Sequence, residues 1–345
     1  MPLLCRHYRE DQGSFMTGWH FHLRGGDDLQ APLAESGLGG FHAALTDPLV
    51  QGRLPPGPLP DYIAGRADYM AGAYGQDRDA IYDRLVAEYL QLDRIDGPVR
   101  ALFWAEADLY DQLLLRVLER LGEKAVGRLW VVQGPLNPGF TVRSPAALAA
   151  MAEAARPATA AMVIMARDAW AAMVTESADR LALLAQIEMP DWPELAPVLA
   201  RRLRDLPWRD SGLTLTERLA LVAVLNGAAT APEVFMSVSA AEPAPFLTEP
   251  MIRPVLARLV IDGLIWRQAE RFTLTELGRR VVSGSAKCSP AAAAWLWDDA
   301  AGRPVPAHEP AGKSADAPTR FGQAQGMVTL PPTIAPSGQV AATPP

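Results

Sequence analysis

The chain has 345 residues, of which 49% are hydrophobic and 21% charged, so it is long enough to bury two or three hydrophobic cores. Its net charge of −7 does not favour general binding of nucleic acid, although residues 1–200 carry −9 and residues 201–287 carry +3. The two cysteines lie far apart and indicate neither a zinc motif nor a disulfide framework. Because a secretory signal pattern and an uncharged apolar segment of spanning length are both absent, we expect a soluble, cytoplasmic protein without membrane contact.

The front half of the chain alternates short apolar runs with segments of helical periodicity, after a polar stretch over residues 1–15 that is expected to be disordered. The expected strands cover residues 19–23, 39–46, 99–105 and 127–133. Their apolar character is continuous, which is typical of a parallel sheet covered by helices on both faces. The sequence therefore predicts a Rossmann-like α/β domain over residues 16–140.

The back half of the chain is expected to be mainly helical. Residues 141–205 are rich in alanine and predict a helical connector. Three helical segments, two short apolar strands and a last helix then follow one another. That order is the order of the winged helix-turn-helix, so we expect a winged-helix-like domain over residues 206–285. Frequent proline and few large apolar residues predict a disordered tail over residues 303–345.

The stretch FWAEADLYDQLLL, residues 103–115, places three carboxylates within six positions where an expected strand passes into a helix. In an open parallel sheet the carboxyl ends of the strands meet at one edge, and ligands bind in the crevice there. Residues that follow the first three expected strands should therefore line one acidic crevice. They are Gly26, Asp27, Asp28, Asp47, Gln51, Glu106, Asp108, Asp111 and Gln112. Arg66, with Arg24 and Arg53 nearby, is expected to balance this charge or to hold an anion.

Several uses of this crevice stay open at the level of sequence. Carboxylate oxygens suit a divalent metal, and they also bind cationic or hydroxyl groups of a substrate or take part in acid–base catalysis. Alternatively, each carboxylate caps a helix or turn. His20 and His22 share one face of the first strand, close to Asp27. A metal site there is conceivable, but we expect one of them to be a core histidine and the other to pack against a helix. The glycine fingerprints of nucleotide-binding loops are absent.

In the winged-helix-like segment the expected recognition helix covers residues 249–262. It would offer Arg253 and Arg258 to DNA phosphates, while Arg267 and Arg271 would lie on the wing. The small positive charge of this segment and a proline at position 254 keep open the alternative that it contacts a protein instead.

Four motifs carry a resemblance to a known family. They are LRGGDDL (23–29), DPLVQGRLP (47–55), RADYMAGAYG (66–75) and LFWAEADLYDQLLLRVL (102–118). Over about residues 16–285 the chain resembles a widespread bacterial family of unknown function, the one catalogued under the number 1835. It departs from that family's pattern at Arg53, where proline is usual, and at Trp104-Ala105-Glu106, where the usual order is Trp-Phe-Glu. The resemblance implies the organisation of the chain and no established activity.

These patterns lead to one main hypothesis and two alternatives. The main hypothesis is a ligand-responsive regulatory protein, with a small-molecule or metal crevice in the α/β domain and a winged helix that contacts DNA or protein. One alternative is a metal-dependent hydrolase or phosphoryl-transfer enzyme, in which the clustered carboxylates bind a divalent metal and Arg66 clamps the anion. The other is an interaction protein without a ligand site.

Overall fold

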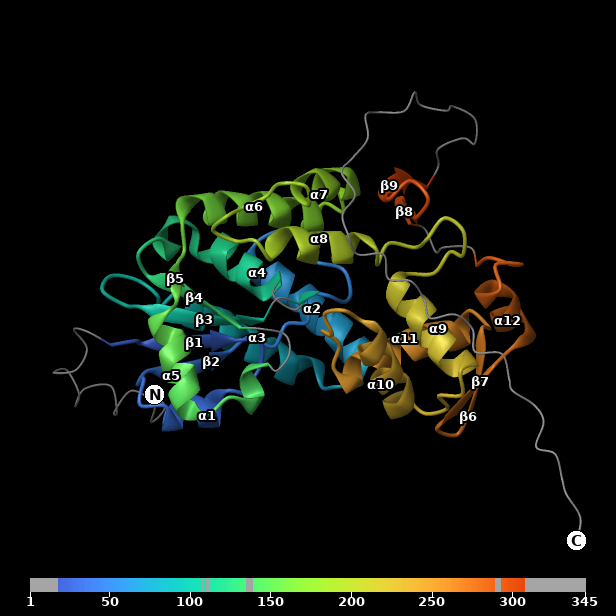
Figure 1. Ribbon diagram of the computed structural model, residues 1–345, viewed down its shortest axis with the longest axis horizontal. Coiled ribbons are helices and arrows are strands. Elements are labelled where there is room, and N and C mark those ends of the chain that lie inside the picture. The colour runs from blue at the N-terminus through green and yellow to red at the C-terminus, as the bar shows by residue number, and fades with distance from the viewer. Residues whose placement is uncertain (1–17, 107, 110–111, 135–138, 289–292, 308–345) are drawn as a thin grey trace, which may run out of the picture. The chain divides into compact units, whose positions relative to one another are not determined.

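A five-stranded sheet in the order β2–β1–β3–β4–β5 forms the centre of the front half (Figure 1). Strands β1 (Phe21–Arg24), β2 (Phe41–Ala44), β3 (Ala101–Glu106) and β4 (Leu129–Gly134) run parallel, and the two-residue β5 (Arg156–Pro157) pairs antiparallel with β4. The computed structural model describes residues 18–106, 108–109, 112–134, 139–288 and 293–307. The α/β class and the mostly parallel sheet predicted from the apolar runs are therefore confirmed, whereas β5 was not predicted.

Helices cover both faces of the sheet because side chains on both of its faces are apolar. On one face, Phe103 and Val131 pack against α2 (Leu59–Tyr74), α3 (Arg78–Leu92), α4 (Gln112–Leu121) and α6 (Ala160–Val174). On the other face, Trp104 and Val132 pack against the short α1 (Gln30–Glu35) and α5 (Pro145–Glu153). All of the side chains from Ala101 to Ala105 are buried, as expected for a strand between two layers.

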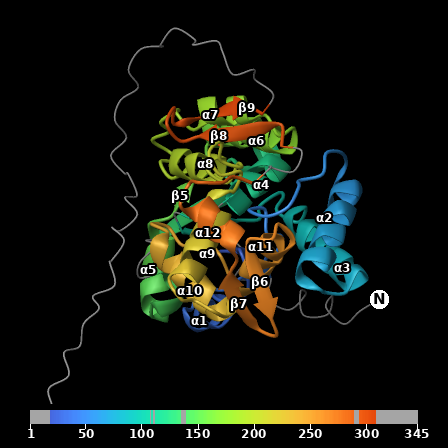
Figure 2. The same cartoon turned by 90° about the vertical axis from the view of Figure 1, so that its right-hand side faces the viewer.

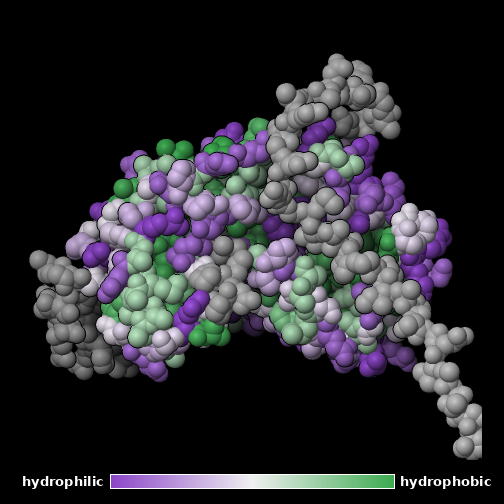
Figure 3. Space-filling view, viewed as in Figure 1, coloured by the Kyte–Doolittle hydropathy of each residue, from purple (hydrophilic) through white to green (hydrophobic). Residues whose placement is uncertain are grey.

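The middle of the chain is helical, as its alanine-rich composition predicts. Helix α6 is followed by α7 (Ala178–Leu184) and α8 (Leu195–Leu203), which pack against one another beside the sheet (Figure 1). Their apolar residues join the same core as the sheet face beneath them. Figure 3 shows polar and apolar residues mixed over this view, with a pale apolar area over α5, whose sequence is mostly alanine.

The back half has its own hydrophobic core. Helices α9 (Leu215–Leu225), α10 (Ala231–Ala241) and α11 (Glu249–Ile261) are followed by the antiparallel hairpin β6 (Ile265–Gln268) and β7 (Arg271–Leu274), and then by α12 (Glu276–Val282). Residues such as Ala220, Val234 and Leu256 fill this core. Figure 2 shows the hairpin beside α9 and α11, and α11 packs against α2 of the front half.

A second hairpin corrects the expected start of the disordered tail. Strands β8 (Trp295–Asp298) and β9 (Arg303–Pro306) pair with each other, although proline content predicts disorder from residue 303 onward. The hairpin forms because Trp297 packs into the main core and its backbone hydrogen-bonds with Pro207 and Arg209. The rest of the expected tail, from residue 308, and the expected N-terminal extension lie outside the described residues.

None of the helices in the described part of the chain is long and apolar enough to cross a lipid bilayer.

Candidate functional site

A buried ion pair fixes the loop that follows β2. Asp47 is 1% exposed and Arg66, on α2, is 0% exposed, and Arg66 Nε donates to Asp47 Oδ1 at 2.7 Å. Tyr62 and Tyr89 donate their hydroxyls to the other carboxylate oxygen, at 2.5 and 3.2 Å. Burial alone would lower the pKa of Arg66, but the charge of Asp47 raises it above its ordinary value. Asp47 and Arg66, both expected in the ligand crevice, thus form an internal structural contact.

Arg66 also holds the backbone of the same loop. Its two terminal nitrogens donate to the carbonyl oxygens of Pro48, Gln51 and Arg53 at 2.9 to 3.0 Å. We call residues 47–53 the β2 loop. Gly52 in this loop has a φ of +74°, and a Cβ there would lie 2.6 Å from the ring of Tyr69, so both the backbone and the space require glycine. The ion pair and Gly52 together give the loop one conformation.

Gln51 connects the β2 loop to the back half of the chain. Its Nε2 donates to the carbonyl oxygen of Met251 on α11 at 2.9 Å, and its Oε1 accepts from Tyr74 at 2.7 Å. This expected ligand residue therefore joins α2, the β2 loop and the first turn of α11.

The carboxyl ends of β1 and β3 form a separate charged group. Arg24 pairs with Asp28 at 3.1 Å and with Glu106 at 2.9 Å, and Glu106 accepts from the backbone N–H of Phe140 at 2.7 Å. Burial alone would lower the pKa of Arg24, but its bond to Asp28 and the charges of Asp28 and Glu106 raise it above its ordinary value. The structure thus brings Asp28 and Glu106 together around Arg24, while Asp47 is held by Arg66.

The other residues of the expected crevice are placed only in part. Gly26 and Asp27 lie on the turn after β1, where Asp27 is exposed. Asp108 is half-buried, and its backbone N–H donates to the carbonyl of Glu106 at 2.7 Å. Asp111 and the side chain of Gln112 lie outside the described residues. Helix α1 begins after Leu29 without a side-chain cap, so capping does not explain Asp28.

His20 and His22 both have partners within the protein. His20 Nδ1 accepts from the backbone N–H of Arg100 at 3.0 Å. His22 lies between Gly39 O, 2.6 Å from its Nε2, and the indole of Trp104, which donates to its Nδ1 at 3.2 Å. Burial lowers the pKa of His22, which favours the neutral ring. Within the described residues, no group of three or more His, Cys, Asp or Glu side chains could hold a metal ion.

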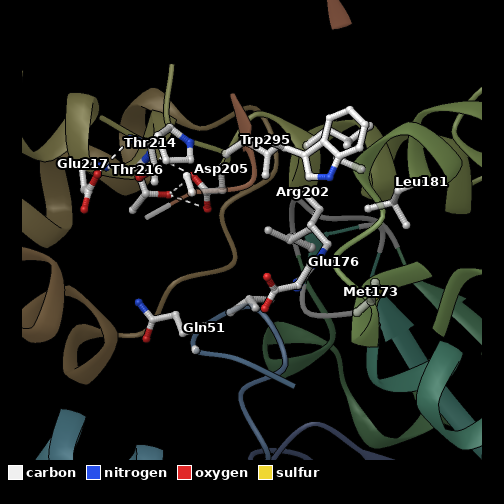
Figure 4. Close-up of a pocket in the computed structure, with 18 of the residues that line it drawn as sticks. Gln51, Met173, Glu176, Leu181, Arg202, Asp205, Thr214, Thr216, Glu217 and Trp295 are labelled. Carbon is white, nitrogen blue, oxygen red and sulfur yellow. Dashed lines mark hydrogen bonds between the residues drawn. The ribbon is translucent and has the colours of Figure 1, made fainter. Parts of the chain in front are cut away.

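A cavity of about 460 Å³ lies between the β2 loop, helices α6 to α9, α11 and the start of β8. This volume suits a small organic molecule. Gln51 and Leu109 contribute from the segments that follow β2 and β3, and Val255 and Arg258 contribute from α11. Figure 4 shows Met173, Leu181 and Trp295 toward one end of the cavity. It therefore lies where the carboxyl ends of two strands meet the back half of the chain.

The opposite end of the cavity is polar and is built at the start of α9. Thr214 accepts from the backbone N–H of Glu217, and Glu217 accepts from that of Thr214, which forms a capping box (Figure 4). Thr216 donates its hydroxyl to Asp205, which also pairs with Arg201 at 3.3 Å. Burial raises the pKa of Glu217 above its ordinary value of 4.5, although the hydrogen bond from the backbone of Thr214 acts to lower it.

Arg202 of α8 lies in the wall between these two ends (Figure 4). One terminal nitrogen donates to the carbonyl oxygen of Leu49 in the β2 loop at 3.1 Å. Burial, together with the positive charge of Arg66, lowers the pKa of Arg202 to about 10. The carboxylates of Asp205 and Glu176 raise the pKa, but they offset the lowering only in part.

The four arginines expected to contact DNA lie on α11 and the hairpin, and three of them pair with acidic neighbours. Arg253 pairs with Glu249 at 2.8 Å, Arg258 with Asp262 at 2.9 Å and Arg267 with Glu270 at 2.9 Å. Arg271, on β7, is exposed. Arg258 also lines the cavity, so it stands closer to the candidate ligand site than the sequence predicts.

Most of the cavity-lining residues were not predicted as site residues. Arg202, Thr214 and Trp295 come from three elements that lie far from the front strands in the chain. In the sequence, Arg202 is one of two adjacent arginines at the end of an amphipathic helix, which is an ordinary pattern. No spacing signal links these residues to Gln51, because only the tertiary packing brings them together.

Comparisons with known proteins add no relative to this picture. No family model, no curated protein and no solved structure matches the chain. The family resemblance of the sequence motifs therefore stays a prediction, and function has to be argued from the geometry.

Replacing Asp47 with asparagine should strongly destabilise the fold, because it leaves the buried guanidinium of Arg66 without its negative partner. Loss of one member of a buried pair costs roughly 3–5 kcal/mol in free energy of unfolding. Urea denaturation measures this change. The control is Asp68→Asn, which removes an exposed partner of Arg78 and should change stability little. Equal effects of the two substitutions would contradict the structural role of Asp47.

Glu217 and Glu233 should give opposite pH dependences, although both are the glutamate of a Thr-x-x-Glu capping box. The raised pKa of Glu217 means that its contribution to stability is full below 4.5 and is lost as the pH rises through its folded pKa. The pKa of Glu233 is lowered by hydrogen bonds from the backbone of Ala229 and Thr230, so its contribution is present above 4.5 and is lost as the pH falls.

The test is urea denaturation from pH 3.5 to 7 of the Glu217→Gln and Glu233→Gln variants, since glutamine keeps the cap. As the pH rises above 4.5, the stability of Glu217→Gln should increase relative to the wild type, because the wild type loses the contribution of Glu217. As the pH rises toward 4.5 from below, the stability of Glu233→Gln should decrease relative to the wild type, because the wild type gains the contribution of Glu233. Curves with the same sign would show that burial does not distinguish the two sites.

Proposed function

We propose that this chain is a ligand-responsive regulatory protein. A small molecule binds in the cavity between the β2 loop and α11, and a winged-helix-like segment formed by α9 to α12 contacts DNA or a protein partner. The observation that carries this proposal is the composition of the cavity wall, because Gln51 from the α/β part and Val255 and Arg258 from α11 line one space.

The topology of the sheet supports a ligand near this edge. In the strand order β2–β1–β3–β4, strands are added to one side of β1 and then to its other side, so the strand order reverses between β1 and β3, as in Rossmann-like and related open α/β folds. Ligands of such folds bind outside the carboxyl ends of the strands. Gln51 follows β2 and Leu109 follows β3, and both line the cavity.

The order of elements in the back half supports the proposal that a winged-helix-like segment contacts the partner. Three helices, a two-stranded hairpin and a closing helix follow one another, with α11 in the place of the recognition helix. Pro254, Val255 and Arg258 on α11 face the cavity, and the same helix packs against α2. A bound ligand would therefore touch the helix that is expected to contact the partner, and its occupancy would shift the equilibrium between positions of α11.

DNA and protein remain two partner classes for this segment. The ion pairs of Arg253 and Arg267 are exposed, and such pairs contribute only about 0–1 kcal/mol, so phosphate groups can compete for these arginines. The metal-dependent enzyme has less support, because Asp47 and Arg66 are already paired with each other in the core.

A thermal-shift screen tests the cavity as a ligand site. Small organic anions, cations and neutral molecules are added to the wild type and to Val255→Trp, which fills the cavity from α11. Ile261→Trp is the control, since Ile261 lies on the same helix and is 77% exposed. Compounds that raise the Tm of the wild type and of Ile261→Trp, but not that of Val255→Trp, would bind in the cavity.

A second measurement tests the regulatory part of the proposal. With such a compound bound, hydrogen exchange in α11 should change, because the ligand contacts this helix. Leu181→Trp, which fills the cavity from α7, provides a second variant in case Val255→Trp does not fold. Tm shifts of equal size in the wild type and all variants would refute the proposal. Hydrogen exchange in α11 that does not change when the ligand binds would also refute it.

A further inference from the structure

We infer that the ligand of the cavity is an organic cation with an apolar body, such as a primary alkylamine, and that Glu217 binds its ammonium group. This assignment rests on the proposed function and adds the chemical class of the ligand. It follows from the hydrogen bonds of Glu217, from the charges of the cavity wall, and from the apolar side chains that surround the space.

Glu217 presents an unused carboxylate oxygen at the polar end of the cavity. In the part of the chain that the structure describes, its Oε2 accepts from the backbone N–H of Thr214, whereas its Oε1 has no hydrogen-bond partner. The residue lines the cavity from the first turn of α9 (Figure 4). An ammonium group at this end can therefore donate to Oε1 without displacing a contact of the protein, and such a charge-assisted bond is stronger than one between neutral groups.

The second capping box of the chain shows how a glutamate is held when it only caps a helix. Glu233 has the same place in α10, and its Oε2 accepts from the backbone N–H groups of both Ala229 and Thr230. These bonds lower the pKa of Glu233, whereas burial raises the pKa of Glu217. The carboxylate of Glu217 has thus lost contact with water without gaining a full set of partners. A cation beside it would supply the missing favourable interaction.

The charged groups of the wall favour a cation over an anion. Among the described residues that line the cavity, the carboxylates outnumber the guanidiniums: they are Glu176, Asp205 and Glu217 against Arg202 and Arg258. The charge of Asp205 raises the pKa of Glu217 further, and that of Arg258 lowers it. An ammonium would therefore enter a space with an excess of negative charge, whereas an anion would be repelled by it.

The two arginines of the wall are bound to other parts of the protein. Arg258 pairs with Asp262 at 2.9 Å, and Arg202 donates to the carbonyl oxygen of Leu49 at 3.1 Å. In Figure 4 Arg202 lies nearer the apolar end of the cavity, whereas Glu217 lies at the polar end. The site for the ammonium is therefore set apart from the guanidinium of Arg202.

Apolar side chains indicate that the ligand also has a hydrocarbon part. Phe246, Leu247 and Val255 line the cavity from the back half of the chain, and Met173 and Leu181 line it from α6 and α7. Removal of apolar ligand surface from water favours binding in such a space. A volume of about 460 Å³ is also much larger than an inorganic cation requires. An amine with a carbon chain contacts both kinds of wall.

Four probes of related structure separate charge from chain length. Octylammonium, 1-octanol, octanoate and methylammonium are titrated into the full-length protein at neutral pH by isothermal titration calorimetry. Octylammonium should bind most tightly, and 1-octanol should bind about tenfold more weakly because it brings no charge to Glu217. Octanoate and methylammonium should show no binding, since the first has the wrong charge and the second has no hydrocarbon chain.

Two matched variants link the preference for an amine to Glu217. Glu217→Gln keeps the capping bond and removes the charge, so octylammonium should bind about tenfold more weakly and lose its advantage over 1-octanol. Glu233→Gln makes the same change in the capping box of α10, away from the cavity, and should leave both affinities unchanged. The ratio of the two affinities is a readout that a general loss of stability would not reproduce.

The pH dependence of binding gives a readout from the wild type alone. An ammonium group favours ionised Glu217, whose pKa lies above 4.5 in the free protein. The affinity of the wild type for octylammonium should therefore increase as the pH rises from 4.5 through this pKa, because protonated Glu217 carries no charge. Glu233→Gln should follow the wild type, and the affinity of Glu217→Gln should change less over the same range.

The outcomes distinguish this inference from the proposed function. Tighter binding of octanoate or 1-octanol than of octylammonium would overturn the assignment of a cation and leave the cavity as a ligand site. Equal octylammonium affinity, or the same pH dependence, in the wild type and Glu217→Gln would overturn the role of Glu217. If octylammonium does not bind, or binds Val255→Trp as tightly as the wild type, the assignment is wrong, and the thermal-shift screen decides the proposed function independently.

Discussion

The ion pair between Asp47 and Arg66 is the constraint on which the candidate site depends. Arg66 binds one carboxylate and three carbonyl oxygens of the β2 loop, so a single buried guanidinium fixes the loop from residue 47 to residue 53. A charge in a core is retained only when its hydrogen bonds are satisfied, and this one meets that condition through the loop. The loop in turn places Gln51 against α11 and Leu49 against Arg202.

The β2 loop therefore connects the sheet to α8 and α11, which form the two other parts of the site. Without a fixed β2 loop, the contact between Gln51 and the backbone of Met251 would lose its geometry, and the wall of the cavity with it. The aromatic ring of Tyr69 packs where any side chain at position 52 would lie, which adds a steric constraint to the electrostatic one. Structural and functional roles thus overlap in one short segment, and a substitution there affects both.

Local patterns predicted the strands and most helices, because continuous apolar runs and helical periodicity report burial directly. The same patterns placed Asp28 and Glu106 at one edge of the sheet, where Arg24 joins them. They could not show that Asp47 points into the core, since a carboxylate after a strand looks the same whether it binds a ligand or an arginine nineteen residues later. Arg202 and Trp295 were not predicted because the cavity exists only through packing between distant elements.

Hydrogen exchange on the Gln51→Leu variant tests the central claim most directly. This substitution removes the contacts with Met251 and Tyr74 but leaves the Asp47–Arg66 pair in place. Backbone amides of α11 should then exchange faster than in the wild type, while those of β1 and β3 should not change, and Gln268→Leu on the exposed side of β6 should have no such effect. Unchanged exchange in α11 would contradict the account, because the β2 loop would then not restrain this helix.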